Sequence, residues 1–180
     1  MDEDEELLQE AIRRVMAREN RRQSEETTDE HGNPLPRLDL DDPTPTTDEP
    51  LLRVGYALLP HLPTGWLTAM LTVAAAADDV RTWVMITKPG EGPSRYEHLH
   101  YLPDVAEAAA ALRHATYEPE RGAWYGLMLR LNANGTLVPR EDHEGPPFLH
   151  WGPREVELLE RDQERYPRPP ERLPAWHPAR

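Results

Sequence analysis

The chain has 180 residues, a formal net charge of -13, 20 prolines and no cysteine. The lack of thiols excludes disulfides and thiolate metal sites, and the negative charge argues against nucleic acid or an anionic membrane as a partner. A mean hydropathy of -0.77 together with so many prolines indicates that part of the chain does not pack into a core.

Most of the negative charge lies at the N-terminus. Residues 1–50 hold 16 acidic and 6 basic side chains, whereas residues 51–180 hold 17 and 14. The first residues are acidic, the reverse of a signal-peptide start, and the longest apolar run, residues 66–77, is too short to span a bilayer. We therefore expect a cytoplasmic protein without a membrane segment.

The first 49 residues form an acidic extension that predicts a helix followed by a linker. Apolar residues recur at helical spacing within residues 3–22, among them Leu8, Ile12 and Val15. Such a stripe needs a partner, either the domain or another protein, because a lone helix is marginal in water. Residues 23–49 combine acids, prolines and threonines without apolar periodicity, which predicts a disordered linker. We therefore expect residues 50–180 to form the domain, and deletion of residues 1–48 to leave it folded.

The clearest pattern is a β-hairpin over residues 66–88. Two apolar runs flank Asp78 and Asp79, and each alternates with the period of two that suits half-buried antiparallel strands. With the two aspartates as the turn, Val73 faces Val84 on the core side.

Two tryptophans fall on the face opposite this expected core. Trp83 lies in the second strand of the hairpin, and Trp124 begins a later strand. Either helices cover that face as well, or it presents a contact surface of the kind that aromatic hot spots favour.

The rest of the chain alternates helices with strands. Three helices are expected at residues 50–59, near 105–115 behind the capping-box spacing of Asp104 and Glu107, and from 153 to 166. Strands are expected at residues 124–132 and 136–140 around the turn Asn134-Gly135, with a short strand possible at 96–102, and the tail is proline-rich over residues 167–180. The order α-β-β-α-β-β-α predicts an α+β fold with an antiparallel sheet of about four strands, built from two hairpins with helices packed on it.

No arrangement of residues predicts an active site. His98 and His100 would share a face of a strand and His143 lies among acids, which leaves a metal-dependent hydrolase as an alternative, but spacing fixes no complete ligand set. Neither Ser24 nor Ser94 lies in a G-x-S-x-G elbow, and the glycines after Lys88 lack the G-K-[ST] of a phosphate loop. We expect no enzyme, no metal and no cofactor.

Several short motifs occur in a characteristic order between residues 50 and 176. A short helix ends before Pro63 and Trp66, a hairpin closes on residues 87–90 (Thr-Lys-Pro-Gly), Trp124 leads a strand to the Asn-Gly turn, and Trp151 follows. This order resembles the YezG-type immunity proteins, which are antitoxins of bacterial polymorphic toxin systems. The resemblance implies a cytoplasmic protein that binds and neutralises a cognate toxin domain, typically nuclease-like, without catalytic residues. The acidic extension and residues 137–142 depart from the family pattern, so the partner can differ.

A nuclease toxin binds a polyanion and therefore tends to present a basic surface, which acidic loops would meet. Charges steer such encounters, while buried aromatic residues supply more of the affinity. The candidate partner-binding residues lie in the first hairpin turn and after the last strand: Asp78, Asp79, Glu141, Asp142, Glu144 and Trp151. An adaptor or secretion chaperone that binds through the N-terminal helix is the second alternative.

Overall fold

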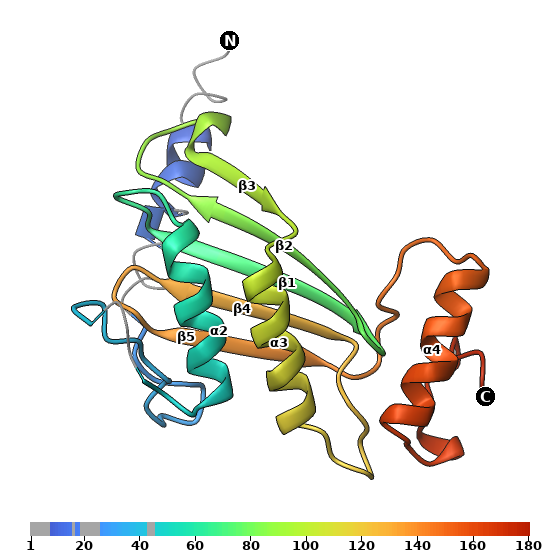
Figure 1. Ribbon diagram of the computed structural model, residues 1–180. Helices are drawn as coiled ribbons and strands as arrows, with labels where there is room; N and C mark the ends of the chain where they lie inside the picture. The colour runs from blue at the N-terminus through green and yellow to red at the C-terminus, as the bar shows by residue number, and fades with distance from the viewer. Residues whose placement is uncertain (1–7, 16, 19–25, 43–45) are drawn as a thin grey trace.

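Five antiparallel strands form one sheet in the order β3-β2-β1-β4-β5 (Figure 1). The strands are β1 (Thr68–Ala76), β2 (Asp79–Thr87), β3 (Tyr96–His100), β4 (Gly126–Asn132) and β5 (Leu137–Asp142). The helices are α2 (Pro50–Leu58), α3 (Pro103–Ala115) and α4 (Pro153–Arg165), with short 3-10 helices η1 (Leu59–His61), η2 (Pro93–Arg95) and η3 (Pro170–Arg172). The predicted α+β class is confirmed.

This computed structural model describes residues 8–15, 17–18, 26–42 and 46–180. The described residues before position 19 are helical, and we refer to them as the N-terminal helix. The ends of the helix expected over residues 3–22 lie outside the described residues.

The sheet has one strand more than the predicted four. The fifth strand is β3, which pairs antiparallel with β2 from Tyr96 opposite Thr87 to His100 opposite Trp83. It is five residues long and follows a loop that is rich in glycine and proline, so its sequence carries only a weak strand signal.

The predicted hairpin is present, but its turn begins one residue early. Leu71 lies opposite Val84 and Ala76 opposite Asp79, so that Ala77 and Asp78 form the turn. Ala77 has a φ of 52°, and its N–H donates a 2.6 Å hydrogen bond to the Asp162 carboxylate. The shift moves the pairing by two residues and therefore leaves every side chain on the predicted face.

Helices α2 and α3 cover one face of the sheet and bury an apolar core. Both helices lie over the strands (Figure 1), and Val54 and Leu58 from α2 and Val105 and Leu112 from α3 belong to the core. The strand residues that they cover are the alternate ones of β1, β2 and β4: Ala69, Leu71, Val73, Val84, Ile86, Leu127, Leu129 and Leu131. Trp124 also belongs to this core, because it precedes β4 and its ring lies inward, with Nε1 donating to Thr116 Oγ1 over 3.1 Å. The prediction that Trp124 lies on the opposite face is therefore wrong.

We call the described residues before α2, 26–42 and 46–49, the acidic segment. This segment contributes to the core, which corrects the prediction of a disordered linker for these residues. Leu38 is 2 % exposed, and Gly55 of α2 leaves room for its side chain, since an added Cβ would lie 2.9 Å from Leu38 Cδ2. The Leu38 N–H donates to Gly135 O over 2.9 Å, and the Leu137 N–H donates to Pro36 O over 2.8 Å. The segment thus runs antiparallel beside the start of β5 and covers part of that sheet edge.

Helix α4 packs against one end of the sheet through a second, smaller apolar cluster. That cluster joins the end of β1 to α4 and the tail: Ala76, Ala77, Tyr125, Phe148, Leu158, Leu159 and Trp176. A buried ion pair supports it, with Arg113 Nη1 donating to Asp162 Oδ1 over 2.7 Å and Nη2 to Oδ2 over 2.9 Å. The Arg113 Nε also donates to Trp124 O over 2.6 Å, so one side chain of α3 links both clusters.

The side of the sheet away from α2 and α3 is open. We call it the open face and define it by outward side chains of its five strands: Met70, Thr72, Arg81, Trp83, Met85, His98, His100, Met128, Arg130, Val138 and Arg140. Trp83 remains 38 % exposed and Met128 46 % exposed. The sequence left open whether helices cover this face, and in the described structure they do not cover Trp83 or Met128.

Candidate functional site

The register of the sheet brings the predicted binding residues to one end of the molecule. Asp79 lies opposite Ala76 at the end of β1. Asp142, at the end of β5, lies opposite Gly126 of β4, and Gly126 in turn lies opposite Ala74 of β1. Neighbouring strands are about 4.8 Å apart, so the first hairpin turn and the end of β5 are separated by roughly 15 Å across the sheet. We call this region the acidic end and define it as Asp78, Asp79, Glu141, Asp142, Glu144, Leu149 and Trp151.

Asp78 in the hairpin turn and Asp79 at the start of β2 both face arginines of α4. Arg161 donates to Asp78 Oδ1 over 2.8 Å, and Arg154 lies 3.5 Å from Asp79 Oδ2. Arg81 of β2 donates to the same Asp79 oxygen over 2.9 Å. These ion pairs offset much of the negative charge of Asp78 and Asp79, but they are largely exposed and add little to the packing of α4.

Asp142 shapes the loop that follows β5. Its Oδ1 accepts hydrogen bonds from Glu144 N over 2.9 Å and Gly145 N over 2.8 Å. These two bonds, with that from Gly145 the stronger, lower the pKa of the Asp142 carboxyl below its ordinary value. The adjacent Glu141 accepts a 3.1 Å contact from the buried His143 ring. Asp142 and Glu141 therefore stabilise the conformation of the loop and also give it negative charge.

Glu144, Leu149 and Trp151 form the outward part of the acidic end. Trp151 is 41 % exposed and its ring centroid lies 5.7 Å from that of Trp176, whose Nε1 donates to Glu144 O over 2.6 Å. Leu149 is 94 % exposed, the highest value among the large apolar side chains that the structure describes. The patch thus combines apolar surface with a carboxylate, and Trp176 contacts both the Trp151 ring and the Glu144 backbone.

Sequence reasoning missed Leu149. Its neighbours Phe148 and Trp151 are both apolar, but Phe148 is buried in the second cluster whereas Leu149 points into solvent. An isolated leucine in a loop between prolines has no periodicity that would predict either outcome. Only its position in the folded loop identifies it.

The histidines of the alternative hydrolase do not come together. His98 and His100 lie outward on β3 as their spacing predicted, and the His98 ring stacks on Trp83 with centroids 5.1 Å apart. His143 follows β5, at the opposite edge of the sheet. Within the described ranges, no group of three potential ligands is placed to hold a metal ion.

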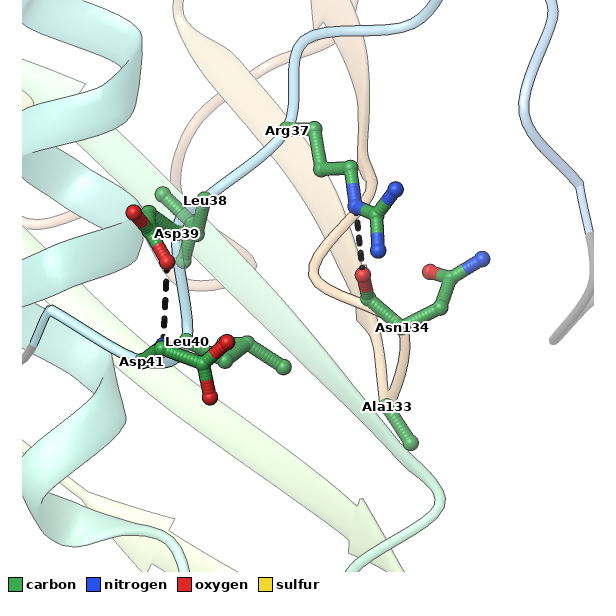
Figure 2. A pocket seen from close by; sticks show the side chains of 7 residues that line it. All are labelled: Arg37, Leu38, Asp39, Leu40, Asp41, Ala133 and Asn134. Carbon is green, nitrogen blue, oxygen red and sulfur yellow. Dashed lines mark hydrogen bonds between the residues drawn. The ribbon is translucent and has the colours of Figure 1, made fainter.

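A hollow lies where the acidic segment leaves the turn between β4 and β5 (Figure 2). It is lined by residues 37–41 together with Ala133 and Asn134. Arg37 Nε donates to Asn134 O over 2.9 Å, and Asp41 N donates to Asp39 Oδ1 over 3.0 Å (Figure 2). One of these bonds joins the acidic segment to the turn and the other lies within the segment, and this arrangement favours a structural role.

No protein-family model matches the chain, and no curated protein matches it significantly. Among the described residues, none of the helices has the length and apolar character needed to cross a membrane.

Proposed function

We propose that this protein is a cytoplasmic immunity protein that binds and neutralises a cognate polymorphic toxin domain, and that it acts by binding without catalysis. The partner is a protein with a basic surface, as a nuclease-like toxin domain would have. The proposal rests on the resemblance of the motif order to YezG-type immunity proteins and on the surface at the acidic end.

The observation that carries the proposal is the exposed pair Leu149 and Trp151 beside Glu144. Apolar residues at an interface supply most of the binding energy when a partner covers them, and surrounding charges set the rate and the choice of partner. A leucine that is 94 % exposed gains no stability for the free protein from its position. A bound partner would bury it.

The carboxylates contribute unequally to this surface. Asp78 and Asp79 are engaged by arginines of α4, and the Asp142 carboxylate accepts hydrogen bonds within its loop. Glu144 is the acid best placed to meet a cation of the partner, because its side chain is exposed next to the two apolar residues. Glu141 is second, since it is only partly buried by its contact with His143.

The test is the association of the purified chain with the toxin domain encoded beside it, measured by surface plasmon resonance. Replacing Leu149 and Trp151 together by alanine should raise the dissociation rate and weaken binding by at least about 2 kcal/mol. A matched control is Leu67→Ala, which truncates an exposed leucine at the other end of β1. Equal loss of binding in the double variant and the control would contradict this contact surface, and no association at all would contradict the proposed function.

The electrostatic part of the proposal has its own readout. Glu144→Lys combined with Glu141→Lys should slow association at low salt, and the defect should shrink as salt rises through screening. Asp142 stays unchanged in this variant, because reversing it would disturb the loop itself. An association rate that is unaffected at low salt would place the basic patch of the partner elsewhere.

A further inference from the structure

The chain exposes two apolar surfaces, one on the N-terminal helix and one on the open face of the sheet. One is the stripe of the N-terminal helix, with Leu8 at 61 %, Ile12 at 50 % and Val15 at 68 % exposure. The other is the centre of the open face. A short amphipathic helix is not stable alone in water, and an antiparallel sheet with an exposed tryptophan and methionines resembles a contact surface. Each surface therefore needs a partner.

The centre of the open face is mostly apolar and continuous across three strands. Thr72 of β1 lies between Trp83 of β2 and Met128 of β4, and in the next row Met70 lies between Met85 and Arg130. Three strands at about 4.8 Å spacing give a width of about 10 Å, which is the diameter of one α-helix with its side chains. One helix would cover this centre.

The acidic segment enters at the border of this face. Glu26 forms an ion pair with Arg130 of β4, and its backbone oxygen accepts a 3.0 Å hydrogen bond from Thr136 Oγ1. The eight steps from residue 18 to Glu26 span at most about 28 Å, while β2 lies only about 10 Å from β4. The N-terminal helix can therefore reach every strand that forms the centre of the open face. In Figure 1 it is drawn in blue behind the sheet, on the side away from α2 and α3.

The charges of the two surfaces are complementary. Between the strand ends, the outward side chains of the open face include three arginines, Arg81, Arg130 and Arg140, and two histidines, His98 and His100, but no acid. Outward acids lie at the strand ends, in Asp79 of β2 and Asp142 of β5, and Asp79 pairs with Arg81. Residues 1–10 hold six acidic side chains and no basic one. Docking with these residues directed toward β2 and β3 would bring opposite charges together.

We propose that the open face is an intramolecular docking surface and that its occupant is the N-terminal helix of the same chain, seated with Leu8, Ile12 and Val15 against Trp83, Met85 and Met128. In the structure the stripe of the helix is exposed, as are Trp83 and Met128 of the face, while Met85 is half-buried. The short connection gives the helix a high effective concentration at the face, which favours this occupant over a separate molecule. The inference is independent of toxin binding, which uses the acidic end.

The test uses the full chain, whose lack of cysteine allows single thiol pairs to be introduced. Ile12→Cys with Met85→Cys is treated with a short bis-maleimide reagent, and the products are separated by mass. The matched control is Ala17→Cys with Met85→Cys, because Ala17 lies on the opposite side of the helix from Ile12. We expect several-fold faster intramolecular cross-linking of the Ile12 pair.

Two outcomes would overturn the proposal. Equal rates for the Ile12 and Ala17 pairs would mean that the helix does not seat its stripe on the face. Cross-linked dimers in place of closed monomers would assign the face to a second copy of the chain.

A second measurement follows the fluorescence of Trp83, taken as the difference between the chain and its Trp83→Phe variant. Ile12→Asp with Val15→Asp should shift that emission to longer wavelength, whereas Ala17→Asp should not, and identical spectra would also overturn the proposal.

Discussion

The two clusters of this fold are held together by different means. Under α2 and α3 the core is almost entirely apolar, although Thr82 is buried there, and its buried positions follow the alternation of the strands. At the junction with α4 the apolar cluster is small, and buried polar groups complete it: the Arg113–Asp162 pair, and Arg168, which donates to His143 O over 3.0 Å and to Ala123 O over 2.8 Å. The first cluster depends on area and volume, which many side chains share. The second depends on a few directional contacts, so that one substitution can remove much of its support.

The largest effect is expected at the polar junction. Asp162→Ala leaves the Arg113 guanidinium buried without its partner and removes the acceptor of the Ala77 N–H. We expect a loss of about 3–5 kcal/mol of unfolding free energy, measured by urea denaturation. Arg161→Ala, which removes the exposed pair with Asp78, is the control and should cost less than about 1 kcal/mol. Similar losses in both variants would mean that the junction is not more sensitive than the surface.

The next effect tests whether the acidic segment belongs to the apolar core. Leu38→Ala should cost about 2–4 kcal/mol, because it empties a site enclosed by Gly55 and Leu137. Leu40→Ala is the matched control, since Leu40 is 40 % exposed two residues further along, and it should change stability by less than about 0.5 kcal/mol.

Truncation sharpens the same comparison. Removing residues 1–25 keeps Leu38 and its bonds to β5, whereas removing residues 1–48 deletes them. We therefore expect the longer deletion to lower the unfolding temperature by much more than the shorter one, which removes only the N-terminal helix and keeps the buried Leu38. A fully stable chain after the longer deletion would return the domain boundary to residue 50.

The smallest effect concerns pH at the junction. Burial lowers the pKa of His177 below its ordinary value of 6.5, with Arg168 acting in the same direction and Asp162 against it. The unfolded chain binds a proton at His177 more readily than the folded chain, so this contribution to stability is present above pH 6.5 and decreases as the pH falls. Unfolding temperatures measured from about pH 7.5 to about pH 5 should therefore fall less steeply in His177→Gln than in the parent. His31→Gln alters an exposed histidine and should keep the parental slope, while parallel curves for parent and His177→Gln would contradict the prediction.

The sequence predicts well which side chains of a strand face the core, but it predicts less well which residues lie opposite one another on paired strands. The alternation of Leu71, Val73 and Ala75 places them on the core side whatever the turn, because the period of a strand is two. The choice of turn residues depends on Asp162, which is 85 positions from Ala77 and accepts its N–H. Local pattern cannot contain that contact.

The candidate site shows the same division. The sequence predicts that six residues lie in loops where a partner can reach them: Asp78, Asp79, Glu141, Asp142, Glu144 and Trp151. The antiparallel register places the ends of β1 and β5, and the loops next to them, at one end of the sheet. Asp78 and Asp79 form ion pairs because arginines of α4 lie next to them. The buried Arg113–Asp162 contact brings α4 to this position. The exposure of Leu149 likewise depends on how its loop lies over the second cluster.

The sequence by itself determined the α+β class, the two hairpins and the absence of thiol chemistry, because periodicity, turn residues and composition are local properties of the chain. Only the tertiary structure decided that β3 completes the sheet, that Leu38 enters the core and that Trp83 and Met128 are exposed on the open face. Those three outcomes depend on contacts between segments far apart in sequence, where the gain from burial or pairing belongs to both segments together and neither one encodes it alone.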